Sequence, residues 1–215
     1  MMGWWDPLLV VPIVLPLFAG ALMLFFDDPR RSVRAGISLT ATIANLGLSL
    51  ALLLEADSAG DVTKVYPLGN WPAPFGIVLV LDRLSALMLL LTAVLATAAL
   101  LFSLARWHRV GVYFHPLFQF LLAGLNGAFL TGDLFNLFVF FEVLLAASYG
   151  LVLYGGGIAR IRSGMHYIVI NLAASFLFLI GVSLIYGVTG TLNLSDIALR
   201  ARLVAPGERM LLETG

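Results

Sequence analysis

One acidic residue, Glu142, lies near the middle of an apolar stretch that runs from Leu134 to Leu153. It follows Asp133 by nine residues. That spacing corresponds to about 13.5 Å of helix, or nearly half the hydrocarbon thickness of a bilayer. A charged side chain costs roughly 2.5 to 3.5 kcal/mol at this depth, so such residues usually face protein or water and serve ion movement. A carboxyl whose cationic neighbour moves can take up and release a proton. Glu142 is therefore our candidate proton relay, and the alternative is a carboxylate neutralised by a structural partner.

Other polar residues are candidates for an accessory path beside Glu142. Tyr149 lies on the same face of a helix as Glu142 and could offer its hydroxyl as a partner. His166 lies close to a pair of arginines, and an imidazole can pass protons near neutral pH, although an interfacial histidine needs no such role. Asn171 and Ser175 are four residues apart on the same expected helix. Such residues hold water chains in some membrane proteins and join helices in others, and we favour the joining role.

Two further candidates, Asp133 and Asn126, have a structural interpretation that we favour. Asp133 follows Thr131 and Gly132 at an expected helix start, where a short carboxylate accepts hydrogen bonds from the free N–H groups of the first turn. The alternative for Asp133 is a role in ion entry. Asn126 lies between two glycines of an apolar segment, a pattern typical of helix packing in lipid.

The remaining composition excludes several classes of function. The chain has no cysteine, which rules out disulfides, cysteine-ligated iron–sulfur clusters and thiol catalysis within it. Twelve basic and twelve acidic residues balance, so nothing indicates a nucleic-acid partner. No metal-ligand cluster and no phosphate-binding glycine loop is apparent, so we expect no cofactor and no metal.

The elements that must position these residues are membrane helices. Of 215 residues, 61% are hydrophobic and 11% are charged, which predicts an all-α integral membrane protein forming one membrane domain over 1–215. About six spanning helices are expected, at 7–26, 33–54, 78–105, 112–131, 134–154 and 165–187. A short interfacial helix is expected at 195–203, and a seventh apolar helix begins at about 208.

The basic residues predict the orientation of the chain. They cluster in alternate connections, as Arg30, Arg31 and Arg34, then Arg106 and Arg109, then Arg160 and Arg162. By the positive-inside rule these three connections are cytoplasmic, which places the N-terminus outside with Trp4 and Trp5 as interfacial anchors. The connection from Glu55 to Gly76 carries three acidic residues and the chain's only lysine, which suits the outer side.

The stretch 132–142 resembles the fifth helix of the D subunit of Mrp-type multisubunit sodium/proton antiporters. Leu81–Ser85 and Gly190–Leu194 are similar to patterns at corresponding places in that family. The resemblance covers the N-terminal part of such a protein. It implies a fold of about fourteen helices with two inverted five-helix repeats, related to the antiporter-like subunits of respiratory complex I and membrane-bound hydrogenases. It also implies that Glu142 pairs with a lysine on a seventh helix.

The resemblance implies a transporter subunit rather than an enzyme. The expected setting is a hetero-oligomeric complex of a bacterial plasma membrane, in which proton entry drives the export of sodium or another monovalent cation. Two alternatives stay open. One is a proton-pumping subunit of a redox complex of the complex I or hydrogenase type. The other is a scaffold subunit whose glutamate holds helices together without transporting ions.

Overall fold

The computed structural model describes residues 6–26, 31–58, 63–71, 76–106, 113–155 and 157–204. Several features named above lie outside these residues: the tryptophan anchors, the beginning of a seventh helix, Arg30, Arg109 and one of the three acidic residues between Glu55 and Gly76, Asp61.

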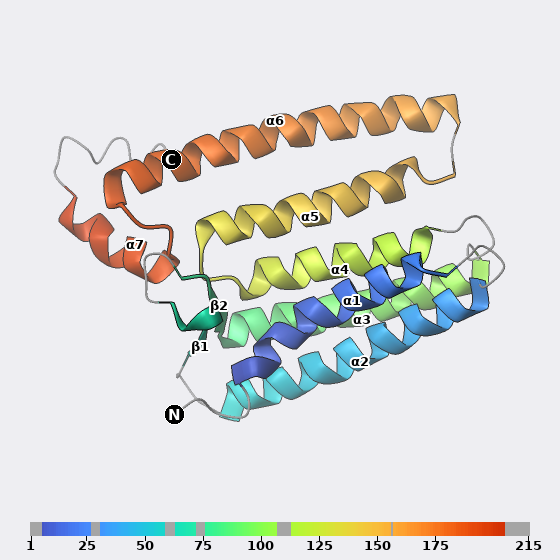
Figure 1. The fold of residues 1–215 in the computed structure, drawn as a ribbon, viewed down its shortest axis with the longest axis horizontal. Helices are drawn as coiled ribbons and strands as arrows, with labels where there is room; N and C mark the ends of the chain where they lie inside the picture. Colours follow the sequence, from blue (N-terminus) through green and yellow to red (C-terminus); the bar gives the residue numbers. More distant parts are fainter. Residues whose placement is uncertain are drawn as a thin grey trace.

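Six long helices lie side by side and make up most of the described chain (Figure 1). They are α1 (Val11–Leu24), α2 (Arg31–Ser58), α3 (Arg83–Arg106), α4 (Phe114–Leu130), α5 (Leu134–Leu153) and α6 (Ile158–Thr189). A 3-10 turn, η1 (Asp6–Val10), leads into α1. Five spans are long and apolar enough to cross a membrane when η1 and α1 are counted together as Pro7–Leu24, whereas α4 has 17 residues and is shorter than these spans. The prediction of an all-α membrane protein is therefore confirmed.

The expected third span begins too early, because residues 78–81 form a strand and not a helix. β1 (Lys64–Pro67) and β2 (Val78–Leu81) make a two-stranded antiparallel hairpin, with the 3-10 turn η3 (Leu68–Asn70) in its connection. A short apolar run has no periodicity that separates strand from helix. Here the pairing with β1 decides, and Asp82 then caps α3 by accepting a hydrogen bond from the Ser85 N–H at 2.7 Å.

Helix α6 begins at Ile158, seven residues before the expected start at 165. Hydropathy detects only the apolar part of a helix, while the backbone hydrogen bonds continue through the polar turn that carries Arg160 and Arg162. The helix starts after two glycines in left-handed conformations, Gly155 (φ 94°) and Gly157 (φ 97°). It ends at Gly190, whose φ of 67° is typical of a helix C-terminus.

The described connections gather at two opposite ends of the bundle (Figure 1). The last turns of α1, α3 and α5 and the first turns of α2, α4 and α6 lie at one end, which we call the arginine end because Arg34, Arg106, Arg160 and Arg162 belong to these helices near it. The hairpin, the α4–α5 link and the short helix α7 (Leu194–Arg200) with its 3-10 turn η4 (Ala201–Leu203) lie at the other end. Which end faces the cytoplasm stays a prediction.

Glycines bring α5 close to the centre of the bundle. A Cβ on Gly124 of α4 would lie 2.7 Å from the backbone nitrogen of Leu144 and 2.9 Å from the Phe140 carbonyl oxygen. The Phe140 ring also lies directly against Gly127. Close approach at small residues is a common way for helices to associate in lipid, so these glycines set the position of α5. By contrast, most side chains of α6 are exposed among the described residues.

Candidate functional site

Glu142 lies on the side of α5 that faces away from α4. Phe140, two residues earlier, packs against Gly127 of α4. Two residues correspond to about 200° around a helix, so Glu142 projects from nearly the opposite side. The residue is half-buried, and its Oε1 atom is buried without a hydrogen-bond partner among the described residues. The structure therefore presents a carboxyl oxygen with an unused acceptor inside an apolar helix.

Tyr149 lies two helical turns beyond Glu142. Its ring packs edge-on against the Tyr167 ring of α6, with the ring centroids 5.7 Å apart. The Tyr149 hydroxyl is buried and has no hydrogen-bond partner within the described ranges. Seven residues separate it from Glu142, which is about 10.5 Å along a helix, and the two groups are not hydrogen-bonded to each other. The site thus contains two polar groups on one side of α5 that the described protein atoms leave unsatisfied.

Asn171 and Ser175 line a cavity of about 220 Å³ between α5 and α6. On the α5 side this cavity is bounded by Phe138, Phe141 and Leu145, the residues that surround Glu142 in sequence. Asn171 donates its Nδ2 hydrogen to the Tyr167 carbonyl oxygen of its own helix at 2.8 Å. The two polar residues therefore lie beside the Glu142 segment, and neither is hydrogen-bonded to the Glu142 Oε1 atom.

His166 lies nearer the arginine end of α6. Its Nδ1 atom is 2.9 Å from the Arg162 carbonyl oxygen, and the side chain is exposed. It precedes Asn171 by five residues, which is about 7.5 Å along a helix. His166 does not line the cavity that Asn171 and Ser175 share.

Asp133 is the N-terminal cap of α5, as the sequence predicts. Its buried Oδ1 accepts a hydrogen bond from the Asn136 N–H at 2.8 Å. Asn136 also donates its side-chain amide to the Thr131 hydroxyl at 2.9 Å. These contacts give the carboxylate a structural role at the beginning of the helix that carries Glu142.

Asn126 joins α4 to α1. Its Nδ2 donates to the Pro12 carbonyl oxygen at 2.8 Å, and the residue is fully buried. The usual donor to that carbonyl would be the N–H four residues later in α1, but residue 16 is proline and has none. Asn126 thus satisfies a carbonyl that the proline leaves without its helical partner, which accounts for an amide at this depth.

Our sequence interpretation did not single out a buried polar seam between α2 and α4. Four small polar residues of α2 are at most 1% exposed: Ser38, Thr42, Asn45 and Ser49. Gln119 of α4 donates to the Ser38 carbonyl at 3.1 Å and to the Thr42 hydroxyl at 2.9 Å. The spacing of 4, 3 and 4 residues along α2 is a signal that could have revealed the seam, because such residues share one helical face.

The described residues contain no group of three or more His, Asp or Glu side chains that could hold a metal ion. The chemistry that this part of the chain offers is that of an isolated carboxyl, a tyrosine hydroxyl and nearby amides and hydroxyls in an apolar setting. Those groups suit the movement of protons or small cations rather than bond-breaking catalysis.

Comparison with known proteins agrees with this chemistry. Residues 131–214 match the family model described as "NADH:quinone oxidoreductase/Mrp antiporter, TM". The chain is 57% identical over 218 aligned positions to the D subunit of a probable K(+)/H(+) antiporter of Rhizobium meliloti (strain 1021), with 100% of this chain and 40% of that protein covered. It is 44% identical to the D subunit of a Na(+)/H(+) antiporter of Alkalihalophilus pseudofirmus, with coverage of 91% and 39%.

Comparison of the fold with solved structures agrees with the sequence comparison. The structure of the Mrp complex from Dietzia sp. DQ12-45-1b contains a chain that superposes with a TM-score of 0.82 at 33% identity, covering 94% of this chain and 40% of that one. The chain thus spans about two fifths of the length of the relatives that it matches. It belongs to the family of membrane proteins that includes the D subunits of the Mrp-type multisubunit antiporters.

Proposed function

We propose that this protein is an ion-translocating subunit of a multisubunit monovalent cation/proton antiporter in a bacterial plasma membrane, with Glu142 as a proton relay. The observation that carries the proposal is the Glu142 carboxyl oxygen, which is buried inside an apolar helix without a hydrogen-bond partner among the described residues. Groups of this kind are costly in a membrane and are usually retained for ion movement. The relatives are named as antiporter subunits, one for potassium and one for sodium, so the exported ion is one of these monovalent cations.

The relay would work through a change in the surroundings of Glu142. Burial without a partner favours the neutral carboxyl, whereas a cation close by favours the carboxylate. Glu142 faces away from α4, on the side of α5 where Tyr149 packs against Tyr167 of α6, so the cation would approach near the contact between α5 and α6. The resemblance implies that this cation is a lysine on a seventh helix. Movement of the lysine would then make Glu142 take up or release a proton in each transport cycle.

We assign the accessory positions according to their contacts. Tyr149 has a hydroxyl that no described residue binds, on the Glu142 side of α5, and Asn171 and Ser175 line the adjoining cavity, so these three are the accessory path residues. His166 would serve proton exchange at the arginine end, where it is exposed. Asp133 and Asn126 are engaged in a helix cap and a helix–helix hydrogen bond, and their effect on transport would come through the position of their helices.

The test is Glu142→Gln in everted vesicles that contain the full complex. Glutamine has nearly the same shape but cannot ionise, so cation-driven proton movement should fall by about tenfold or more. Asp57→Asn is the matched control, because Asp57 is an exposed carboxylate whose 3.6 Å ion pair with Arg83 joins the end of α2 to the beginning of α3, at the end of the bundle opposite the arginine end. It should leave exchange unchanged. Full exchange by the Glu142→Gln complex would remove Glu142 from the mechanism.

The second candidate function is a proton-pumping subunit of a redox complex. The description of the matching family joins NADH:quinone oxidoreductase with the Mrp antiporters, and this observation favours the candidate. Co-purification of the protein with flavin or iron–sulfur subunits would decide for it. Their absence from an active antiporter complex would decide against it.

A scaffold role makes a different prediction for the same variant. Here Glu142→Gln would reduce the amount of assembled complex, while the assembled fraction would exchange ions at the normal rate. Measuring exchange per assembled complex separates this outcome from the relay, because the relay predicts loss of exchange in fully assembled particles.

A further inference from the structure

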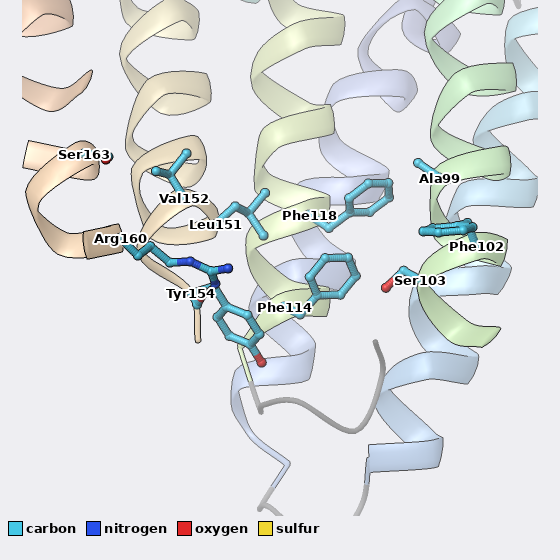
Figure 2. Close-up of a pocket in the computed structure, with 10 residues that line it drawn as sticks. All are labelled: Ala99, Phe102, Ser103, Phe114, Phe118, Leu151, Val152, Tyr154, Arg160 and Ser163. Atoms are coloured by element: carbon cyan, nitrogen blue, oxygen red, sulfur yellow. Dashed lines mark hydrogen bonds between the residues drawn. The ribbon is translucent and has the colours of Figure 1, made fainter. Parts of the chain in front are cut away.

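A cavity of about 650 Å³ lies at the arginine end of the bundle, and Glu142 is not among its lining residues. Figure 2 shows the residues that line it. Four helices contribute to its wall. Phe102 of α3 and Phe114 and Phe118 of α4 provide aromatic surface, and Arg160 of α6 lies beside Tyr154 on the opposite side. The cavity is within the size range of ligand sites, and its wall is mainly apolar.

Helix α4 is the shortest of the four helices that line the cavity. Its 17 residues correspond to about 25 Å, which is less than the roughly 30 Å of a bilayer's hydrocarbon core. The neighbouring helices are longer, since α3 has 24 residues and α6 has 32. Phe114, the first residue of α4, lines the cavity together with Phe118.

The charge that the described residues give to the cavity wall is positive. Among the described residues, Arg160 is the single charged residue of its lining, and no carboxylate lines it. Arg160 donates from Nη1 to the Tyr154 carbonyl oxygen, which holds the guanidinium at the cavity while its other N–H groups stay available. Ser103 also lines the cavity, is only 6% exposed, and has a buried hydroxyl to which no described residue is hydrogen-bonded.

We propose that this cavity binds an anionic phospholipid, with an acyl chain against the phenylalanines and the phosphate at Arg160. The apolar wall suits a hydrocarbon chain, and a guanidinium forms paired hydrogen bonds with a phosphate. The Ser103 hydroxyl gains a partner in the ester region of the lipid. Basic pockets between membrane helices on the cytoplasmic side bind lipid headgroups in this way, and the arginine end is the predicted cytoplasmic end.

The experiment measures lipid retained by the full-length polypeptide in its complex, reconstituted with equal amounts of phosphatidylglycerol and phosphatidylethanolamine and then purified in detergent. Native mass spectrometry counts each retained lipid. Arg160→Gln should lower retained phosphatidylglycerol about fivefold, the effect expected of one basic residue near a membrane surface. Arg162→Gln is the matched control, because Arg162 is on the same exposed turn but does not line the cavity. Arg160→Lys keeps the charge and should retain most of the lipid.

A second pair of variants tests the acyl-chain site. Ala99→Phe fills the cavity and should lower retention of both lipids, whereas Ala98→Phe places the same ring on an exposed residue outside the cavity and should not. Equal retention by wild type and Arg160→Gln, or an equal fall in Arg162→Gln, would overturn the headgroup assignment. Unchanged retention by Ala99→Phe would overturn the acyl-chain assignment, and preferential retention of phosphatidylethanolamine by the wild type would overturn the anionic choice.

The lipid site does not depend on the proposed transport function. Glu142→Gln should retain phosphatidylglycerol at the wild-type level, since Glu142 does not line this cavity. Loss of antiport in that variant with normal lipid retention would separate the two proposals.

Discussion

Asp133 and Asn193 pair across an isolated antiparallel β-bridge, and each also caps the helix that follows it. Asn193 accepts hydrogen bonds through Oδ1 from the N–H groups of Ser195 and Asp196, at 3.1 and 3.2 Å. Two backbone bonds of 2.9 Å flank the bridge, from Leu134 N to the Leu192 carbonyl and from Leu194 N to the Gly132 carbonyl. The start of α5, which sets the depth of Glu142, is therefore held by the link between α6 and α7.

The Asp133 cap can be separated from any role of its charge. Asp133→Ala removes the acceptor for the Asn136 N–H and should lower the free energy of unfolding by about 1 kcal/mol. Asp133→Asn keeps an acceptor of equal capping strength and should be close to wild type. Thermal unfolding of the detergent-solubilised protein measures both. An equal loss of antiport in both variants, with normal stability in the asparagine variant, would instead support ion entry through Asp133.

The hydrogen bond from Asn126 to Pro12 predicts a coupling between α4 and α1. Asn126→Leu leaves the Pro12 carbonyl without a partner and should destabilise the protein by about 1 kcal/mol. Pro16→Ala restores the helical N–H that can bond to the same carbonyl. In the double variant the cost of Asn126→Leu should therefore shrink, and a double-mutant cycle of unfolding free energies measures the difference. Strict additivity of the two changes would contradict this account of the amide.

Gly124 predicts a steric limit on how close α4 and α5 lie. Gly124→Ala places a methyl group against the backbone of Leu144 and should cost about 1 to 3 kcal/mol by overpacking. Gly47→Ala is the control, since a Cβ there meets no atom within 4 Å and alanine favours the helix. The measurement is unfolding of each variant together with the yield of assembled complex. Equal stability of the two variants would show that α5 can move away from α4 without cost.

Asp82 predicts an acid-dependent contribution to stability at the start of α3. The hydrogen bond from the Ser85 N–H is the main cause that lowers the pKa of the Asp82 carboxyl below its ordinary value. Because the pKa of this carboxyl is lower in the folded state, its contribution to folding stability is fully present at pH values above the unfolded-state pKa of about 3.9. The contribution is lost as the pH falls through the folded-state pKa. Asp82→Ala should thus be less stable than wild type by about 1 kcal/mol at pH 7, with the difference disappearing in strong acid.

The control for this prediction is the same comparison for Asp57→Ala, which removes an exposed carboxylate that caps no helix. Its unfolding should differ little from wild type at either pH, because exposed ion pairs contribute little. A wild-type minus Asp82→Ala difference that stayed constant from pH 7 to strong acid would rule out the carboxylate cap as its source.

Features that depend on neighbouring residues along the chain could be predicted from the amino-acid sequence. Hydropathy over about twenty residues reveals the apolar helices, because crossing a bilayer requires that length whatever the neighbours are. The position of Glu142 within α5 and the cap at Asp133 follow from helix rise and from hydrogen bonds three residues apart. These are local properties, and the structure agrees with them.

Features that join distant residues depend on how the helices pack, and the sequence alone did not predict them. Val78–Leu81 is a strand because it pairs with Lys64–Pro67, and the β-bridge of Asp133 joins residues sixty positions apart. The partner of Asn126, the polar seam of α2 and the direction in which Glu142 points depend on which helices lie next to each other. Hydropathy cannot rank these arrangements, because apolar helices gain little from choosing one apolar neighbour over another in lipid. The choice is made by small residues, hydrogen bonds and helix lengths at the contacts.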